Sequence, residues 1–172
     1  MSDYEVIDNF FPQDVLNEFN SLLMPDEFIE NPTQHVYWCY TPSVATRKIE
    51  DWRLFYLTHT VYDYTICSPF YEKLMTIPTI KRLDFKALIR IKINMFPNTE
   101  TLKEHGMHVD YKFPHKGALF SINTCDGYTK LEDGTKIDSV ANRMLLFDAS
   151  KPHTSTTTTN QTVRVNINFN YF

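Results

Sequence analysis

Short apolar runs separated by polar, glycine-containing segments dominate the C-terminal half of the chain. All four glycines lie between Gly106 and Gly134, where we expect turns between strands. Repeated short strands joined by hairpin turns predict a jelly roll or double-stranded β-helix. Four runs have the length and the β-branched or aromatic content of strands: residues 88–96, 118–123, 144–147 and 162–169.

The N-terminal third combines helix and strand signals. Pro12 stands at a plausible first helical position, and apolar side chains follow it at helical spacing. Ser68 is expected to cap a second helix that continues to about Met75. Residues 35–40 are typical of a strand, whereas the aromatic stretch 52–64 fits either structure.

These patterns predict a mainly β fold with flanking helices, of the α+β kind. The 172 residues are expected to form a single domain, which is long enough to bury a core without disulfides. Within residues 1–172, we expect residues 1–87 to be an N-terminal strand and helix support region. Residues 88–172 would then form the double-stranded β-helix core, which is jelly-roll or cupin-like.

Charge and cysteine content restrict the partners and the compartment. The formal net charge is -4, and Lys and Arg form no extended cluster, which disfavours nucleic acid as a partner. The three cysteines show no paired spacing, which suits a reducing compartment. The N-terminus is polar and acidic, and no apolar run approaches about 18 residues, so we expect no secretory signal, no membrane span and a cytoplasmic location.

His108, Asp110 and His153 are the candidate metal ligands. In an extended strand residues i and i+2 project to the same side, so His108 and Asp110 can hold one ion together. His153 lies 43 residues beyond Asp110 and would supply the third ligand. Two imidazoles and one carboxylate occupy one face of an octahedral metal and leave three positions open, as in non-haem Fe(II) enzymes that activate oxygen.

His105 is the main rival ligand. A His105-x-x-His108 pair would suit zinc if the segment were helical, but residues i and i+3 do not share a face on a strand, and Gly106 disfavours a helix. His115, between Pro114 and Lys116, is expected to lie in a loop. His35 and His59 fall in the N-terminal third, where a surface position is expected over a place in a substrate groove.

The last strand-like run has a polar face. Alternation along residues 162–169 places Arg164, Asn166 and Asn168 on one side and apolar residues on the other. Arg164 follows His153 by 11 residues. A polar interior face beside a metal is what a binding cavity needs.

From Leu88 to the C-terminus the chain resembles the Fe(II)/2-oxoglutarate-dependent dioxygenases, most closely their prolyl 4-hydroxylase-like branch. The resemblance is carried by His108-x-Asp110, by the run 142–148 ahead of His153, and by Arg164. Residues 4–11 also look like the opening strand of many members. The chain is similar in size to small single-domain bacteriophage versions, which would place it in the cytoplasm of a host.

The resemblance implies a reaction and its cofactors. Fe(II) would be held by His108, Asp110 and His153, which would be the catalytic residues, and 2-oxoglutarate would chelate the metal while Arg164 binds its distal carboxylate. A planar, permanently charged guanidinium suits a carboxylate. With O2, 2-oxoglutarate would be converted to succinate and CO2 while a C–H bond of the substrate is hydroxylated, with ascorbate as a supporting reductant. The substrate would be a peptide or protein, with peptidyl proline favoured, or a small molecule.

Some positions depart from the family pattern. Members often carry a tyrosine where this chain has Phe96 or Phe120-Ser121, and those hydroxyls commonly contact the co-substrate. Asn166 replaces the small hydroxyl residue that usually follows the arginine by two positions. Asn94 and Asn166 are expected to supply the lost hydrogen bonds, ahead of Asn123 and Ser155.

Two other classes of protein remain open. A cupin-like metalloenzyme that does not use 2-oxoglutarate would commonly need more histidines around the metal, so His105 as a ligand would favour it. A non-catalytic β-sandwich binding or virion module with a vestigial site would bind no divalent metal.

Overall fold

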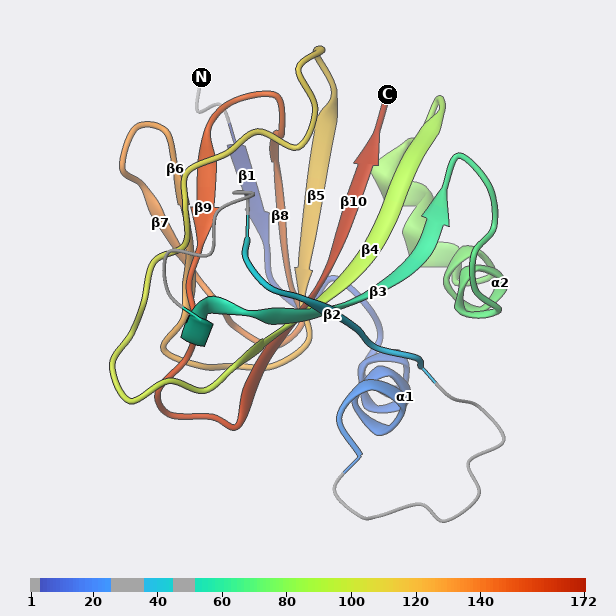
Figure 1. Ribbon diagram of the computed structural model, residues 1–172. Helices are drawn as coiled ribbons and strands as arrows, with labels where there is room; N and C mark the ends of the chain where they lie inside the picture. Colours follow the sequence, from blue (N-terminus) through green and yellow to red (C-terminus); the bar gives the residue numbers. More distant parts are fainter. Residues whose placement is uncertain (1–3, 26–35, 45–51) are drawn as a thin grey trace.

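The computed structural model describes residues 4–25, 36–44 and 52–172, and within them two antiparallel sheets form the molecule (Figure 1). The large sheet has seven strands in the order β1-β8-β5-β10-β4-β3-β2, and the small sheet has three in the order β7-β6-β9. The strands of the large sheet are β1 Tyr4–Ile7, β2 Cys39–Thr41, β3 Tyr56–Asp63, β4 Leu88–Pro97, β5 Lys116–Ser121, β8 Arg143–Asp148 and β10 Val163–Tyr171. Those of the small sheet are β6 Tyr128–Leu131, β7 Lys136–Asp138 and β9 His153–Ser155. The predicted mainly β class is confirmed.

A further extended segment lies along the free edge of β9. Glu104 pairs with Thr156, and His108 pairs with His153 through two backbone hydrogen bonds of 2.9 and 2.8 Å. Residues 104–108 therefore extend the small sheet at its β9 edge, which gives the order β7, β6, β9 and then 104–108. From β4 onwards the chain passes back and forth between the two sheets, except that β6 and β7 are consecutive strands of the small sheet, and β8-β5-β10-β4 are the four strands that this part of the chain adds to the large sheet.

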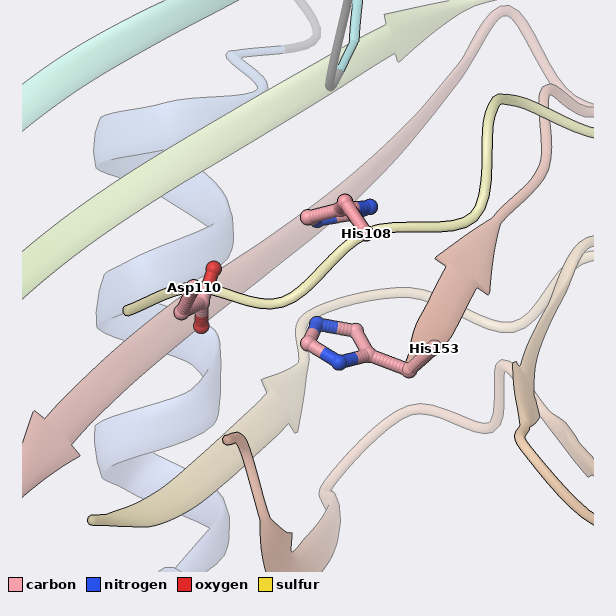
Figure 2. A group of neighbouring side chains, drawn as sticks. All are labelled: His108, Asp110 and His153. Atoms are coloured by element: carbon pink, nitrogen blue, oxygen red, sulfur yellow. The ribbon is translucent and has the colours of Figure 1, made fainter. Parts of the chain in front are cut away.

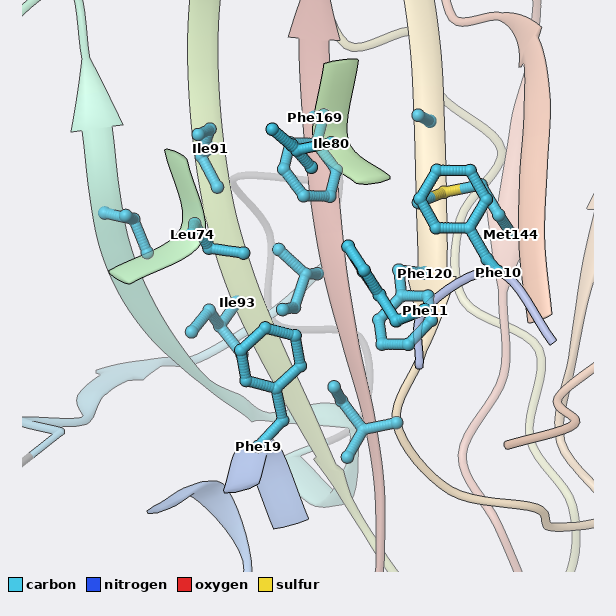
Figure 3. Packing of buried hydrophobic residues seen from close by; sticks show 14 of the residues in the cluster. Phe10, Phe11, Phe19, Leu74, Ile80, Ile91, Ile93, Phe120, Met144 and Phe169 are labelled. Atoms are coloured by element: carbon cyan, nitrogen blue, oxygen red, sulfur yellow. The ribbon is translucent and has the colours of Figure 1, made fainter. Parts of the chain in front are cut away.

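The hydrophobic core lies on one face of the large sheet, beneath two helices. These are α1 Gln13–Leu23 and α2 Phe70–Met75. On β10 the apolar side chains, among them Ile167 and Phe169, pack into this core with Phe19 of α1 and Leu74 of α2 (Figure 3). Full burial stabilises each such side chain by about 1.5–3 kcal/mol. The polar residues of β10 point to the other side, where the small sheet lies.

The N-terminal elements differ in detail from the prediction. Pro12 occupies the N-cap position, so the first helix begins one residue later, at Gln13. The predicted strand at 35–40 begins only at Cys39, and residue 35 lies outside the described residues. The ambiguous stretch 52–64 contains a 3-10 turn and strand β3. The backbone N–H of Phe70 donates to Ser68 Oγ at 3.2 Å, so Ser68 contributes a cap from one residue before the N-cap.

One expectation in the β half, a turn at each glycine, was wrong at Gly117. Gly117 lies inside β5 rather than in a turn. A Cβ there would stand 2.7 Å from Ala149 Cβ, so close packing is the reason for glycine at this position. Gly134, with φ of +88°, does form the turn between β6 and β7. Strand β9 ends at Ser155, and the chain from Thr156 to Thr159 continues as irregular chain with single bridges.

No helix within the described residues is long and apolar enough to span a membrane. Cys39, Cys67 and Cys125 are free thiols.

Candidate metal centre

His108, Asp110 and His153 meet on the face of the large sheet opposite the core (Figure 2). One potential ligand atom from each lies within 4.8 Å of the others, and the two imidazole centroids are 4.6 Å apart. Donors bonded to one octahedral ion at about 2 Å stand about 3 Å apart, so modest side-chain movements would close the site. The structure thus brings together all three residues that the sequence singled out as ligands.

Backbone carbonyls orient both imidazoles. His108 Nδ1 lies 3.1 Å from Gly106 O, and His153 Nδ1 lies 3.0 Å from Lys151 O. Because a carbonyl oxygen only accepts, each Nδ1 carries the proton in the neutral ring and each Nε2 keeps its lone pair. This is the arrangement that fixes the tautomer of a metal-binding histidine.

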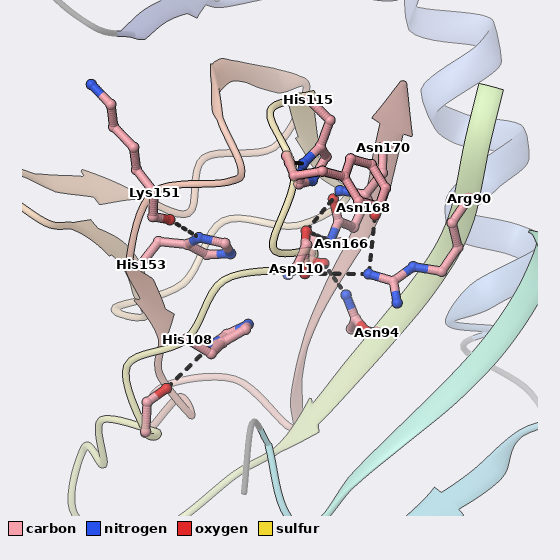
Figure 4. A network of polar contacts seen from close by, with 12 residues as sticks. Arg90, Asn94, His108, Asp110, His115, Lys151, His153, Asn166, Asn168 and Asn170 are labelled. Atoms are coloured by element: carbon pink, nitrogen blue, oxygen red, sulfur yellow. Dashed lines mark hydrogen bonds and ion pairs between the residues drawn. The ribbon is translucent and has the colours of Figure 1, made fainter. Parts of the chain in front are cut away.

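Asp110 is held by three side-chain donors (Figure 4). Arg90 Nη2 donates to Oδ1 at 3.2 Å, while Asn168 Nδ2 and Asn170 Nδ2 donate to Oδ2 at 3.0 and 2.7 Å. Burial by itself would raise the pKa of Asp110, but Arg90, His153 and the two amides outweigh burial and hold the pKa well below its usual range. Asp110 therefore stays ionised, as a metal ligand must.

The protonation state of His108 also suits a ligand. Burial, followed by the nearby His153, lowers the pKa of His108 below its usual value. Neutral imidazole is the form that binds a metal. At neutral pH the cluster thus offers neutral imidazole nitrogen and an anionic carboxylate, which fits a divalent cation of intermediate hardness such as Fe(II) or Mn(II).

A cavity of about 180 Å³ opens beside the three residues and is lined by both sheets. Three of its lining side chains carry a buried polar atom with no hydrogen-bond partner among the described residues, namely Arg90 Nε, Asn94 Oδ1 and Asn168 Oδ1. Leaving such an atom unpaired costs about 1–3 kcal/mol, so these atoms indicate a polar ligand. The lining residues include Tyr56, Arg90, Lys92, Asn94, Phe96, His108, Val109, Asp110, Leu119, Thr129, Phe147, His153, Thr154, Ser155, Asn166 and Asn168.

Arg164 lies behind the cavity wall rather than on its surface. Its side chain is fully buried, its Nη1 donates to Tyr128 O at 2.9 Å and to Thr156 O at 3.1 Å, and its Nη2 donates to Thr129 Oγ1 at 3.0 Å. Nε has no partner among the described residues. Burial lowers the pKa of Arg164 to about 10, so the side chain is still a cation at neutral pH. Nε and the remaining Nη2 hydrogen form the free edge of the guanidinium.

Asn94 and Asn166 stand opposite each other on β4 and β10 and line the cavity. Asn94 Nδ2 donates to Asn166 Oδ1 at 2.9 Å, which leaves Asn94 Oδ1 unpaired. Asn123, in contrast, is used by the backbone, because it donates to Val163 O and accepts from the N–H of Val165. Ser155 does line the cavity.

The two aromatic departures have different structural meanings. Phe96 lines the cavity, stacks on Tyr56 with centroids 5.4 Å apart, and lies 5.7 Å from Arg164 Cζ. Phe120 instead packs in the core against Phe11, on the helix side of the sheet. A hydroxyl at position 120 would therefore point away from the cavity, and its neighbour Leu119 is the residue of β5 that faces it.

The other histidines of the described residues, His59, His105 and His115, lie outside the cluster. His105 is buried, its Nδ1 contacts Ser155 Oγ at 2.8 Å, and burial lowers its pKa to about 4. It does not belong to the group of potential ligands found among the described residues. His59, expected at the surface, is buried and bridges Tyr37 O and Ser68 Oγ. His115 does lie in a loop, although its ring is buried beside Tyr111.

Sequence reasoning missed the cationic side of the site. Arg90 and Lys92 line the cavity together with Asn94, as residues i, i+2 and i+4 of β4. Asn170, two residues beyond Asn168 on β10, completes the support of Asp110. The sequence does contain a signal, because Arg90, Lys92 and Asn94 alternate with isoleucines and so share one face of the strand.

Comparison with solved structures identifies the fold. A prolyl-4-hydroxylase from Pseudomonas putida matches with a TM-score of 0.57 at 10% identity, covering 98% of this chain and 92% of that one. An oxidoreductase of the 2OG-Fe(II) oxygenase family from Burkholderia pseudomallei matches with a TM-score of 0.69 at 9% identity, over 98% and 84% of the chains. The non-haem α-ketoglutarate-dependent epimerase SnoN from nogalamycin biosynthesis matches with a TM-score of 0.60 at 14% identity, covering 99% of this chain and 77% of that one.

No family model matches the chain, and no curated protein does. The structural likeness establishes the fold: the chain has the double-stranded β-helix of the 2OG-Fe(II) oxygenases, as the sequence predicted.

Proposed function

We propose that the protein is a non-haem oxygenase that uses Fe(II), 2-oxoglutarate and O2 to hydroxylate a C–H bond of its substrate. The observation that carries the proposal is the convergence of His108, Asp110 and His153 beside a polar cavity. Solved structures with the same fold are 2OG-Fe(II) oxygenases, which supports this general class of reaction.

His108, Asp110 and His153 would hold the metal, and their donor set fits Fe(II). Two neutral imidazoles and one carboxylate satisfy one face of the ion and leave positions for 2-oxoglutarate and O2. When bound, iron and 2-oxoglutarate supply the oxidising chemistry, with succinate and CO2 as the products of the co-substrate.

Arg164 would bind the distal carboxylate of 2-oxoglutarate. The free edge of its guanidinium, with the unpaired Nε, is suited to the two parallel hydrogen bonds that a carboxylate accepts. Thr129 and Phe96 separate Arg164 from the cavity, so small movements of these two side chains would admit the carboxylate. Asn94 and Asn166 would hydrogen-bond the co-substrate between Arg164 and the metal.

The remaining residues of the site position these groups and exclude water. Arg90, Asn168 and Asn170 hold the Asp110 carboxylate, and the carbonyls of Gly106 and Lys151 hold the two imidazoles. Leu119 and Phe147 provide an apolar part of the cavity wall. Such preorganisation keeps the reacting atoms in place and limits side reactions.

Succinate release with Fe(II), ascorbate and 2-oxoglutarate tests the proposal. The wild-type protein should convert 2-oxoglutarate slowly alone and faster with a substrate, whereas His108→Ala should lose both activities and most Mn(II) affinity. Lys86→Met is a matched control, because Lys86 pairs with Asp84 at the exposed surface. Full turnover by His108→Ala would contradict the proposal.

The substrate panel should include both a proline-containing peptide and small molecules. One structural neighbour is a prolyl hydroxylase in complex with a peptide fragment, and another is an epimerase. Peptidyl proline is therefore one substrate to be tested. The fold by itself does not select among them.

A further inference from the structure

Lys92 is a cation in the cavity that the chemistry of the metal and co-substrate does not use. It lies on β4 between Arg90 and Asn94, and its cross-strand partners are Asn168 on β10 and Thr60 on β3. The side chain lines the same cavity as His108 and Asp110. Its position therefore brings an ammonium group to the wall beside the metal cluster.

The Lys92 ammonium has no hydrogen-bond acceptor or carboxylate partner among the described residues. The ammonium lies over the ring of Tyr56, whose centroid is 5.5 Å from Nζ. Arg90, two residues earlier, is bonded to both Asp110 and Asn170. Burial, followed by the charge of Arg90, lowers the pKa of Lys92 to about 8, so the group is still mostly charged at pH 7. The charge of Asp110 offsets only part of this effect, and a partly buried cation without a direct ion-pair partner favours an anionic ligand.

The charges around the cavity point to the same kind of ligand. Asp110 is the only acidic side chain that lines it among the described residues, and it already pairs with Arg90. With a divalent metal and the doubly charged 2-oxoglutarate in place, the positive charges of the metal, Arg90, Lys92 and Arg164 still exceed the negative ones. An acidic group on the substrate would balance this excess.

The backbone positions of Lys92 and Arg164 lie at opposite ends of the polar face formed by β4 and β10. On β10 the partner of Lys92 is Asn168, whereas Arg164 pairs with Phe96, four residues along each strand. Four residues of strand correspond to about 13 Å. Asn168 contacts Asp110, so Lys92 lies at the metal end of this polar face and Arg164 at the opposite end. The distal carboxylate of 2-oxoglutarate belongs to the Arg164 end.

We propose that Lys92 binds an acidic group of the primary substrate, and that this substrate is a small carboxylate-bearing molecule rather than an uncharged residue within a peptide. The proposal rests on the proposed function, because it assigns the substrate of the same site. Lys92 is here a substrate-binding and specificity-determining residue. Its ammonium would donate to the carboxylate, while the cation–π contact with Tyr56 holds the lysine chain along the wall.

The experiment compares matched acids and carboxamides as stimulators of succinate release. The panel contains small carboxylic acids, free L-amino acids such as L-proline among them, the carboxamide of each, and a capped proline-containing peptide. We expect at least one acid to raise the rate above the level without substrate and its carboxamide to do so at least 10-fold less well. Lys92→Met should raise the KM for that acid about 10- to 100-fold, and Lys92→Arg should restore much of the loss.

Three other results would overturn the inference. The first is that no acid stimulates, or that carboxamides or the capped peptide stimulate equally well. The second is that Lys92→Met and Lys86→Met have the same KM for the acid. The third is that Lys92→Met raises the KM for 2-oxoglutarate instead of that for the acid, which would assign Lys92 to the co-substrate. Failure of the proposed function looks different, because the wild-type protein would then release no succinate under any condition.

Discussion

Arg90 and Asp110 form an ion pair beside the metal cluster, with Arg90 Nη2 3.2 Å from Asp110 Oδ1. Both side chains are mostly buried, at 19% and 6% exposed. The pair also links β4 to the segment that carries His108, because Arg90 is a β4 residue and Asp110 follows His108 by two positions. The carboxylate is thereby fixed both in charge and in direction.

Replacement of Arg90 by methionine should weaken metal binding without removing a ligand. Asp110 would keep two amide donors but lose the cation that lowers its pKa. Loss of a group that orients a metal ligand typically costs about 10- to 100-fold in affinity. We expect a decrease of that size in Mn(II) affinity by calorimetry at pH 7.5, and no change in Lys86→Met. An unchanged affinity in Arg90→Met would show that the amides alone position Asp110.

Metal affinity should depend on pH in a defined direction. The pKa of His108 is lowered from 6.5 by burial and by His153, and only the neutral ring binds a metal. Affinity should therefore be highest above about pH 6.5 and fall as the pH decreases, by on the order of 10-fold between pH 7.5 and pH 5. Mn(II) titrations across this range measure it. A flat profile would argue against imidazole ligands.

Arg164→Met should raise the KM for 2-oxoglutarate about 100-fold or more, since a buried bidentate contact to a carboxylate would be lost. Mn(II) affinity should change little, because Arg164 does not contact the three ligands. Arg164→Lys is the matched variant, which keeps the positive charge but not the planar guanidinium. Its KM for 2-oxoglutarate should lie between those of the wild type and Arg164→Met. The Arg164 side chain also bonds Tyr128 O and Thr156 O, so circular dichroism should accompany the kinetics. An unchanged KM in a folded Arg164→Met protein would remove Arg164 from the co-substrate site.

His105 should make stability fall as the pH decreases from about 6.5 to about 4. Its pKa is about 4 in the folded protein against 6.5 for an ordinary histidine, mainly because the ring is buried. Between these values the unfolded chain binds the extra proton, so the native state loses up to about 3 kcal/mol that is fully present above pH 6.5. Urea unfolding of the wild type and His105→Gln at pH 7.5 and pH 4.5 tests this. The difference in unfolding free energy between the two pH values should be smaller in His105→Gln, and an equal difference would contradict the assignment.

The sequence predicted most of the β core because its signals are local. His108 and Asp110 share a side through the two-residue period of an extended chain, and the same period separates Arg164 and Asn166 from the apolar residues of β10. Convergence of His153 on the pair depends on pairing between distant segments, and only the resemblance to a family supplied it before the structure did. Phe120 shows where prediction from the sequence fails. Neighbouring residues of β5 point to opposite faces of the sheet, so Phe120 packs in the core whereas Leu119 lines the cavity.

Residues 88–96 show a different limit. Arg90 and Lys92 alternate with isoleucines, which indicates a strand with one polar face, but the sequence does not say what that face meets. In the structure it meets the metal cluster, because β10 lies beside β4 and carries Asn168 and Asn170 opposite Lys92 and Arg90. The partners of a polar strand face are set by neighbours far away in the chain.

Two backbone hydrogen bonds join His108 to His153, so binding of the metal ion depends on the docking of the segment that carries His108. Until the 104–108 segment docks on β9, the chain offers only a His–Asp pair in one place and a lone imidazole in another, and neither binds a cation tightly. Metal binding during refolding would therefore mark the step at which the 104–108 segment joins β9. A slow step in closure would delay metal uptake even when most of the secondary structure has already formed.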